Sequence, residues 1–440
     1  MKRIKKIAAM TFGCKINQYE TSCIINEFLH NGYQYADFDQ LANVYIINTC
    51  TVTNRTDQKS RNAIRKALQQ KYIDPTIKII VTGCYSQRKK QEIAELGDVN
   101  LIIDNNEKSK VYKYLMNPDL LDTQISDDSA KKEFDELFTT KMIDHSRAFI
   151  KVQDGCDNYC AYCAIPYARG TSRSRDKYKV LEQISTLTEQ DYCEFVLGGI
   201  NLGLYGREKK DNYFLADLLK DIEKIEKVKL IRLSSIEPQL FTNDLLEYFR
   251  NSKKICHHFH IPLQVGCDEL LKKMGRKYKT EEFKNVISEI RNIIPDAALG
   301  IDVIVGLPGE TEEYFQKTYN FLNELDFTYL HVFSYSKRPG TKAAEMNDQT
   351  NGKIQKQRSN WLIKLSEKKL SEYKHLILRN EVVLSGVFEQ KTRGYWTALS
   401  DHFIRVYLNS KTDLKKKYLQ FKPQNTKFDG IEVKLLDKLR

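Results

Sequence analysis

Three short apolar runs near the start of the chain share one arrangement, in which each leads through a polar turn with a cysteine into a segment of helical periodicity. Continuous apolar runs that are bounded by turns and separated by helix-length segments are typical of buried parallel strands in βαβ units. The runs are residues 7–10, 44–47 and 79–81, with a fourth at 101–103, and the cysteines after the first three are Cys14, Cys50 and Cys84. Because parallel strands end along one edge of a sheet, the pattern predicts that these cysteines lie together at that edge.

A second series of apolar runs, again alternating with helical patterns, follows a polar stretch without sustained periodicity. The strand candidates are residues 149–152, 195–197, 230–233, 259–263, 299–305 and 329–333. Six βα units in succession predict a partial or complete α/β barrel, with an active site at the carboxyl ends of its strands. After residue 370 the runs become short and alternating, which predicts a small all-β domain.

These patterns predict an α/β protein of three domains. We place the domains at residues 1–121, 146–370 and 371–440, with a linker at 122–145. A chain of 440 residues with 41% hydrophobic residues can build real cores, which excludes a mostly disordered protein. No apolar run reaches the ~18 residues of a membrane helix, so we expect no membrane segment. The apolar patch at the N-terminus is too short for a signal peptide, and we therefore expect a cytoplasmic protein.

Charge is distributed unevenly along the chain. Lys and Arg number 70 against 58 Asp and Glu, a net charge of +12, and residues 371–440 alone hold 14 basic and 8 acidic residues. Basic and aromatic side chains alternate in this segment, which suits RNA contact through phosphates and base stacking. The candidates for RNA contact are Arg393, Tyr395, Trp396 and Arg405. The alternative is that the aromatic side chains form the core of the β domain.

Cys156, Cys160 and Cys163 form a CxxxCxxC motif directly after the first strand of the barrel series. Ten cysteines are too few for a disulfide scaffold in a chain of this length, so metal ligation or catalysis has to be considered. A structural zinc site would use four protein ligands, usually in two close pairs. Three thiolates on one short loop instead suit a 4Fe-4S cluster whose fourth iron stays open to a small molecule.

This loop, with the aromatic Tyr162 just before its last cysteine, resembles the signature of the radical S-adenosylmethionine (SAM) superfamily. The resemblance implies that SAM binds the open iron and is cleaved reductively to a radical that removes an unactivated hydrogen. It also implies that residues 146–370 form the partial (β/α) barrel of that superfamily.

The N-terminal cysteines narrow the resemblance further. The segments around Cys14, Cys50 and Cys84, which read GCKINQYET, NTCTVT and TGCYSQ, resemble three sequence blocks of the methylthiotransferase family. In that family these cysteines hold a second, auxiliary 4Fe-4S cluster, which carries the sulfur that is transferred. The C-terminal β domain resembles the RNA-binding TRAM domain of the same family. The resemblance thus implies two 4Fe-4S clusters and SAM as cofactors.

Further segments that resemble family blocks follow the predicted barrel strands, and the resemblance implies that they contact SAM or the substrate. The expected cofactor contacts are Tyr162, Gly198, Gly199, Arg232, Ser234, Glu237, Gln264 and Asp302. Glycines permit close backbone approach, carboxylates accept hydrogen bonds, and an arginine can pair with a carboxylate. Ile200 departs from the pattern, because many radical SAM enzymes have Glu there. The other four cysteines, which we expect to be buried hydrophobic side chains, are Cys23, Cys193, Cys256 and Cys267.

Within the family, the blocks resemble most closely the branch that acts on N6-threonylcarbamoyladenosine (t6A) beside the tRNA anticodon. The resemblance implies a reaction that replaces C2–H of this base by a methylthio group. We expect a monomer whose partners are the tRNA anticodon arm, a sulfur donor and a reductant. The alternatives are the same chemistry on N6-isopentenyladenosine, a non-catalytic iron-sulfur RNA-binding protein, and a zinc-dependent RNA-binding module.

Overall fold

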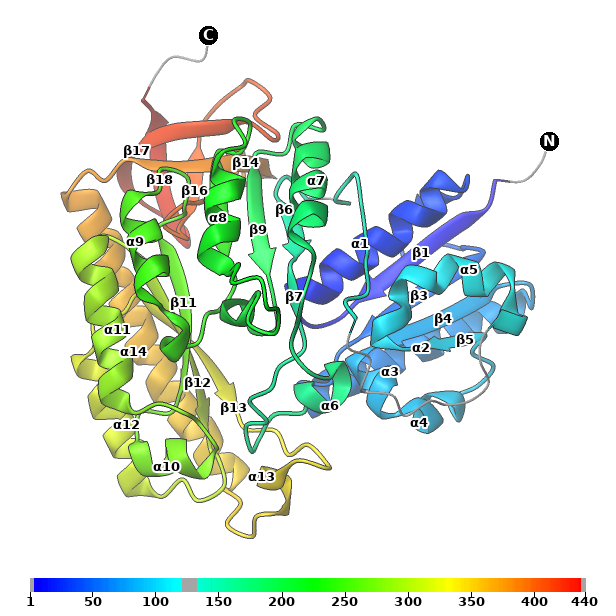
Figure 1. Ribbon diagram of the computed structural model, residues 1–440, viewed down its shortest axis with the longest axis horizontal. Helices are drawn as coiled ribbons and strands as arrows, with labels where there is room; N and C mark the ends of the chain where they lie inside the picture. Colours follow the sequence, from blue (N-terminus) through cyan, green and yellow to red (C-terminus); the bar gives the residue numbers. More distant parts are fainter. Residues whose placement is uncertain (1–3, 121–132, 144, 437–440) are drawn as a thin grey trace.

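The computed structural model describes residues 4–120, 133–143 and 145–436. Within them the chain forms a five-stranded α/β unit, a larger α/β barrel and a small β-barrel, in that order along the sequence (Figure 1). This arrangement confirms the predicted fold class. Much of the predicted linker, residues 122–132 and residue 144, lies outside the described residues. Among the helices that the structure describes, none is both long and apolar enough to cross a bilayer.

The N-terminal unit is a parallel sheet in the order β2-β1-β3-β4-β5. Its strands are β1 (Lys6–Thr11), β2 (Gln34–Ala36), β3 (Val44–Thr49), β4 (Lys78–Gly83) and β5 (Leu101–Ile103). Its helices are α1 (Lys15–His30), α2 (Asn54–Ile73), α3 (Cys84–Arg88), α4 (Lys90–Ala94) and α5 (Val111–Met116), with 3-10 turns at Asn105–Lys110 and Pro118–Leu120. Tyr45 and Ile47 of β3 pack with α2, while Val44 and Ile46 pack with α1 and α5. The four predicted strands are therefore buried on both faces, and only the polar edge strand β2 was missed.

The central unit is a six-stranded parallel barrel that does not close. Its strands are β6 (Ala148–Lys151), β9 (Glu194–Gly198), β10 (Leu230–Leu233), β11 (His258–Gln264), β12 (Ala298–Val305) and β13 (Tyr329–Ser334). They form two three-stranded sheets, β10-β9-β6 and β11-β12-β13, which meet where β10 contacts β11. No pairing joins β6 to β13, although the structure describes both strands completely. The barrel therefore has an open side, and the six strands predicted from sequence are confirmed.

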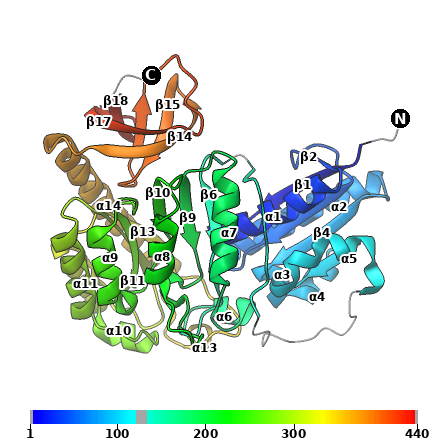
Figure 2. The same ribbon diagram turned by 45° about the horizontal axis from the view of Figure 1, so that its top comes forward.

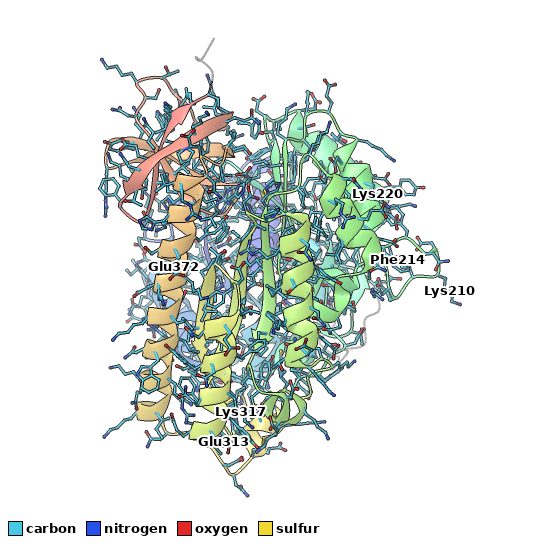
Figure 3. The ribbon with its side chains drawn as sticks, turned by 90° about the vertical axis from the view of Figure 1, so that its left-hand side faces the viewer. Lys210, Phe214, Lys220, Glu313, Lys317 and Glu372 are labelled. Carbon is cyan, nitrogen blue, oxygen red and sulfur yellow. The ribbon has the colours of Figure 1, made fainter. Side chains whose placement is uncertain are left out.

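An outer layer of helices covers the barrel strands. The helices of this unit are α6 (Ile165–Arg169), α7 (Lys177–Thr188), α8 (Leu215–Glu223), α9 (Asn243–Asn251), α10 (Asp268–Lys273), α11 (Thr280–Ile293), α12 (Glu312–Glu324), α13 (Lys342–Glu345) and α14 (Gly352–Arg379), with 3-10 turns at Leu202–Leu204 and Pro238–Leu240. A short hairpin joins β7 (Gln153–Asp154) to β8 (Arg173–Ser174). Figure 3 shows Glu313 and Lys317 of α12 and Glu372 of α14 on the outer face, where all three are solvent-exposed. The predicted domain boundary at residue 370 falls inside α14, which runs on to the next unit.

The C-terminal unit is a closed barrel of five strands in the order β14-β15-β16-β18-β17. The strands are β14 (Leu384–Thr392), β15 (Tyr395–Ser400), β16 (Arg405–Leu408), β17 (Tyr418–Lys427) and β18 (Gly430–Leu435). Its core includes Val406, Phe421 and Ile431, all without exposed surface. The predicted small β domain is confirmed, and its closure leaves no long unpaired strand edge.

The small barrel sits over the amino ends of the central barrel strands (Figure 2). Phe403 stacks on His258, the first residue of β11, with ring centroids 4.0 Å apart. His402 lies between Asp401, at 2.9 Å, and Asp296, at 3.4 Å. Burial disfavours the charged imidazole, but the two carboxylates outweigh it and raise the pKa of His402 to about 9. A charged histidine therefore holds this interface at neutral pH.

Candidate active site

The three N-terminal cysteines meet at the carboxyl edge of the first sheet, as their positions after strands predict. Cys14 precedes α1, Cys50 follows β3, and Cys84 begins α3 directly after β4. Each thiol is an electrostatic neighbour of another in the set. A Cβ at Gly13 would lie 2.6 Å from the sulfur of Cys50, so only glycine lets the first loop come this close. The edge therefore gathers three thiols from three separate βα turns.

The loop with Cys156, Cys160 and Cys163 closes on itself beyond β7. The Cys163 amide donates a hydrogen bond to the Cys160 carbonyl at 2.9 Å, and the three thiols interact electrostatically. Gly155 enters the loop with a φ of +71°, where a Cβ would meet the Thr171 carbonyl at 1.9 Å. This turn is thus open only to glycine. The loop presents its three sulfur atoms as one group.

Arg276 and Glu237 hold the cysteine loop in place through hydrogen bonds. The Arg276 guanidinium donates to the sulfur of Cys160 at 3.1 Å and to Glu237 at 2.9 Å, and Asn158 of the loop also donates to Glu237, at 2.6 Å. Glu237 thus fixes the loop instead of standing free. Tyr162 lies next to Arg276, and its phenol has a pKa raised well above the usual value, because it is buried.

Burial also governs the thiols themselves. It raises the pKa of Cys50 and of Cys163 to about 12 and that of Cys156 to about 11. These groups are therefore neutral thiols when no metal is bound, and loading a metal must displace their protons. Such displacement is the usual behaviour of cysteine ligands, which bind metals as thiolates.

A buried ion-paired cluster joins the N-terminal unit to the central barrel beside Cys84. Its cations are Lys108, Lys151, Arg169 and Arg173, and its carboxylates are Glu20 and Asp154; every one of these side chains is at most 3% exposed. Four cations against two carboxylates leave a net charge of +2. Arg169 also donates to the sulfur of Cys84 at 3.3 Å. A cationic surplus at a set of thiols fits an anionic iron-sulfur cluster better than it fits three neutral thiols.

A cavity of about 340 Å³ lies beside Cys163 of the barrel loop and is also lined by residues of the N-terminal unit. Its wall includes Val52 and Thr53, which follow Cys50, and Tyr162 and Cys163 of the barrel loop; Gln264, Asp302 and Phe333 close it from the strands. Its volume is within the range of small-molecule sites. Arg338, at the rim, pairs with Asp57 of α2 and donates to Thr51 at 3.0 Å, which ties the barrel to the N-terminal unit. The cavity therefore lies between two units that are fixed to each other.

The remaining predicted contacts surround this cavity in different ways. Asp302 accepts from His260 at 2.8 Å and pairs with His331 at 3.4 Å. Burial opposes its ionisation, but the two imidazoles outweigh burial and hold the pKa of Asp302 below its usual range. The Ser234 hydroxyl accepts a hydrogen bond from the Gly199 amide at 3.2 Å. Gly198 faces α1, since a Cβ there would meet Ile16 at 2.9 Å.

Two predicted residues have different surroundings from those expected. Arg232 is fully buried, pairs with Glu194 at 2.9 Å and donates to the Ser400 carbonyl at 2.9 Å. The Arg232 side chain points to the amino end of the barrel, because its partner Glu194 is the first residue of β9. The carboxylate that Arg232 binds is therefore one of the protein and not of a cofactor. Trp396 is 7% exposed and lies in the core of the small barrel. Neither side chain therefore has the free surface that its predicted role requires.

The other predicted RNA contacts lie together on the outside of the small barrel. The Arg393 guanidinium lies 4.6 Å from the centre of the Phe428 ring, and Tyr395 packs edge-on against the same ring at 6.2 Å. Arg405 is near Asp429, at 3.4 Å. Phe428 is half-exposed and was not predicted, because a single aromatic residue before Asp-Gly has no periodic signal. The group forms a basic and aromatic surface.

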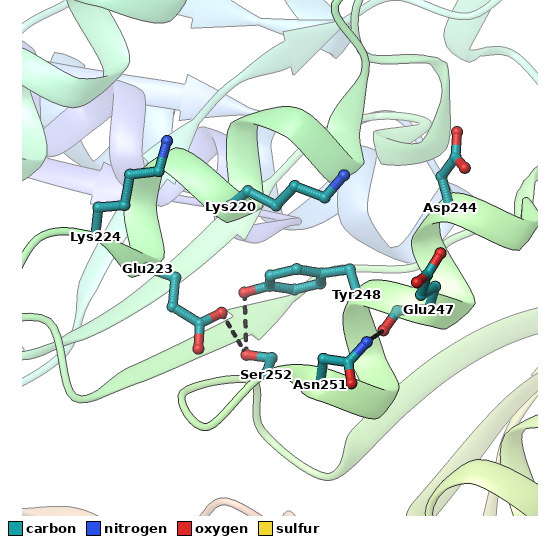
Figure 4. Close-up of a pocket in the computed structure, with 8 residues that line it drawn as sticks. All are labelled: Lys220, Glu223, Lys224, Asp244, Glu247, Tyr248, Asn251 and Ser252. Atoms are coloured by element: carbon teal, nitrogen blue, oxygen red, sulfur yellow. Dashed lines mark hydrogen bonds between the residues drawn. The ribbon is translucent and has the colours of Figure 1, made fainter.

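Sequence reasoning also missed the charged side chains that fix the two cysteine sets. Arg169 and Arg276 were assigned no role, although both donate to a cysteine sulfur. The only sequence signal was their presence in otherwise conventional helical or turn segments, which is no signal of contact. A second hollow, between α8 and α9, is lined by Lys220, Glu223 and six other polar or aromatic residues without a cysteine (Figure 4). It therefore has no thiol that could hold an iron-sulfur cluster.

Comparison with known proteins agrees with this geometry. Residues 6–104 match the family described as uncharacterized protein family UPF0004, and residues 150–322 match the radical SAM superfamily. A protein of Bacillus subtilis named threonylcarbamoyladenosine tRNA methylthiotransferase MtaB is 39% identical, over 94% of this chain and 93% of its own. The chain belongs to the methylthiotransferase family of radical SAM enzymes. An iron-sulfur cluster and SAM are thus cofactors of this methylthiotransferase.

Other relatives of this methylthiotransferase span two named activities. A protein of Aquifex aeolicus with the same MtaB name is 37% identical, over 89% of this chain and 97% of its own. A protein of Natranaerobius thermophilus named tRNA-2-methylthio-N(6)-dimethylallyladenosine synthase is 33% identical, over 86% of this chain and 84% of its own. The solved structure of the radical SAM methyltransferase TsrM from Kitasatospora setae has a TM-score of 0.57 at 12% identity, covering 78% of this chain and 77% of that one. This last likeness shows the fold alone.

Proposed function

We propose that this enzyme converts t6A next to the anticodon of tRNA to its 2-methylthio derivative. Relatives with that printed activity are 39%, 37% and 35% identical, above the 33% of the dimethylallyladenosine enzyme. The observation that carries the proposal is a cavity lined by Cys163 of the barrel set and by Val52 and Thr53, which follow Cys50 of the N-terminal set. Radical removal of hydrogen and delivery of sulfur must reach the same carbon, and a shared cavity allows both.

The proposal assigns each cysteine set to a 4Fe-4S cluster. Cys156, Cys160 and Cys163 would hold the cluster that binds SAM, and the N-terminal set of Cys14, Cys50 and Cys84 would hold an auxiliary cluster. When bound, these groups supply the electron that cleaves one SAM, the removal of the C2 hydrogen, and the sulfur that a second SAM methylates. The chain supplies the ligands, their spacing and the positive surroundings of Cys84.

The barrel residues around the cavity would bind and orient SAM and the base. Asp302, kept ionised by two histidines, can accept hydrogen bonds from ribose hydroxyls. Gln264 and Tyr162 form part of the wall, while Gly198 and Gly199 leave room for the side chains of Ile16 and Gln153. Ser234 and Glu237 would act indirectly, by fixing the Gly199 turn and the cysteine loop.

The basic and aromatic surface of the small barrel would bind the anticodon arm. Arg393 and Arg405 are exposed cations that can contact phosphates, and Tyr395 offers a partly exposed ring for stacking. The sulfur donor, the reductant, the monomeric state and the cytoplasmic location stay predictions.

Mass spectrometry of tRNA nucleosides tests the substrate. Cells that lack the protein should lose 2-methylthio-N6-threonylcarbamoyladenosine and accumulate t6A, and the gene restored in the same cells should reverse both changes. A response of 2-methylthio-N6-isopentenyladenosine instead would transfer the proposal to the alternative substrate. An unchanged pattern of both nucleosides would reject a tRNA methylthiotransferase role.

Cysteine variants test the two clusters separately in purified, anaerobically reconstituted enzyme. Cys160→Ala should abolish formation of 5′-deoxyadenosine, whereas Cys50→Ala should retain it and lose only the methylthio product. Iron should fall by about one cluster in each variant. Cys193→Ala, a matched change outside both sets, should keep iron and both products. Normal methylthiolation by Cys50→Ala would reject the auxiliary cluster.

A further inference from the structure

Lys15 is the first residue of α1, directly after Cys14. The next residue, Ile16, touches Gly198 of β9 from inside the barrel, and α1 lies along β6. Figure 1 shows the amino end of α1 beside β6. The electrostatic neighbours of the Lys15 ammonium are Arg147, Arg232 and Glu194 of the barrel wall. The side chain therefore extends into the lumen, the space enclosed by the six barrel strands.

This lumen is accessible to solvent and ligands. Leu330 and Val332 of β13 pack into the outer core, so the alternate residues His331 and Phe333 face inward. The His331 side chain is 48% exposed and Phe333 is 45% exposed. Lys15 is exposed as well. Asp302 and Phe333 also line the cavity beside Cys163, and Asp302 pairs with His331 at 3.4 Å, so the cavity adjoins the lumen.

The Lys15 ammonium has no ion pair or hydrogen bond with any residue in 4–120, 133–143 or 145–436. The neighbouring cations do have partners. Arg232 pairs with Glu194 at 2.9 Å, and Arg147 pairs with Glu389 at 2.9 Å. Glu194 is thus already used, and no acidic residue lies in the first turn of α1. Among the residues that the structure describes, Lys15 is therefore a cation without a carboxylate in ion-pair contact.

Two arginines beside the cavity have carboxylate partners. Arg338 pairs with Asp57, and Arg276 pairs with Glu237. Arg88 has no carboxylate partner, but it donates to the Pro339 carbonyl in the loop before α13, outside the strand lumen. Lys15 is the cation that stays available to a ligand on the lumen side.

We propose that Lys15 binds the carboxylate of the threonylcarbamoyl group and so selects t6A over adenosines with an uncharged N6 substituent. This inference rests on the proposed function and names the residue that carries its substrate choice. Among the N6 substituents considered, threonylcarbamoyl carries a negative charge, while isopentenyl is apolar. An ammonium in a confined lumen favours the first through a charge-assisted bond and penalises the second, which would bury it unpaired.

Binding to an anticodon stem-loop tests this without turnover. Fluorescence anisotropy compares three RNAs that differ only at the target adenosine: t6A, the methyl ester of t6A, and N6-isopentenyladenosine. Wild-type enzyme should bind the t6A RNA about ten- to a hundred-fold more tightly than the ester RNA, the effect of one charged hydrogen bond. Lys15→Gln should bind both alike, and Lys15→Arg should restore part of the preference. Arg88→Gln, the matched loss of another cation without a carboxylate, should keep the wild-type preference.

Three outcomes would overturn the inference. Wild-type enzyme could bind the ester and the acid equally, a comparison that needs no variant and so does not depend on folding. Lys15→Gln could keep the preference for the t6A RNA over the ester RNA. It could also weaken the binding of both RNAs to the same extent, which would indicate that Lys15 contacts a phosphate. Failure of the proposed function looks different, since wild-type enzyme would then make no 2-methylthio-t6A at all. Iron content and 5′-deoxyadenosine formation should stay normal in Lys15→Gln.

Discussion

Glu20→Gln neutralises a carboxylate that three buried cations share. Glu20 has no exposed surface, accepts from Lys151 at 3.0 Å and from Arg169 at 3.0 and 3.2 Å, and also pairs with Lys108. The ion-paired cluster holds four cations and two carboxylates, so the change raises its net charge from +2 to +3. A buried ion pair that loses one partner costs about 3–5 kcal/mol. We expect a loss of that size in the free energy of unfolding.

Two further variants separate the charge effect from the loss of a contact. Lys108→Met removes a cation from the same site, lowers the net charge from +2 to +1, and leaves Glu20 paired with Lys151 and Arg169. It should cost less than Glu20→Gln. Glu182→Gln removes a carboxylate that is 56% exposed in its pair with Lys179, and such a surface pair contributes less than about 1 kcal/mol.

Urea unfolding of the metal-free protein, followed by circular dichroism, measures these differences. The chain has several units, so the midpoint and slope of the first transition are compared, because a single free energy for the whole chain is not defined. The expected order of loss is Glu20→Gln, then Lys108→Met, then Glu182→Gln. The reasoning fails if Glu20→Gln behaves like Glu182→Gln, or if Lys108→Met is the most damaging of the three.

A glycine of the backbone, a histidine at the interface of the small barrel and two aromatic residues of that barrel give three more tests. Gly83 has a φ of +106°, and a Cβ there would lie 2.2 Å from a backbone carbonyl, so Gly83→Ala should lower both the melting temperature and the iron content. Gly352→Ala is the control, because a Cβ there would have nothing within 4 Å, and it should change neither quantity. Equal behaviour of the two variants would contradict the steric argument. Because the pKa of His402 is raised to about 9, its charge stabilises the fold fully below about pH 6.5, and the stabilisation, about 3 kcal/mol, is lost as the pH rises through about 9. The difference in urea midpoint between wild type and His402→Asn should therefore shrink over that range, and a difference that is constant with pH would refute the charge. Tyr395→Ala should weaken RNA binding about ten-fold, measured by anisotropy, and leave the urea midpoint unchanged. Trp396→Ala should instead lower the free energy of unfolding by about 3–5 kcal/mol, measured by urea unfolding. The reverse pattern would show that the tryptophan is the RNA contact.

The strands and the placement of the cysteines could be predicted because both depend on local pattern. Cys14, Cys50 and Cys84 each follow an apolar run, and the geometry of parallel sheets then brings them to one edge. The same reasoning placed the Cys156 loop after the first barrel strand. In the N-terminal sheet, the edge strand β2 is short and mostly exposed, and its pattern is too weak to be recognised.

The charged environment could not be predicted, because its partners are distant in sequence. Glu20 and Lys151 lie 131 positions apart, and each is an ordinary polar residue in its own segment. Strand alternation also leaves open which end of a barrel a long side chain turns toward, and for this reason Arg232 was assigned to the wrong surroundings. Tyr395 and Trp396 are neighbours on one strand, so they face opposite sides, but nothing local says which side is the core.

The distance between the two cysteine sets depends on contacts that contain no cysteine. One set belongs to the N-terminal sheet and the other to the barrel, so their separation is fixed where Arg338 meets Asp57 and where Arg169 meets Glu20. Both contacts are buried charge pairs with fixed hydrogen-bond directions, and such pairs contribute more to specific geometry than to net stability. Removal of hydrogen and delivery of sulfur at one carbon demand a fixed separation. The buried charges between the units are therefore as much a part of the site as the thiols.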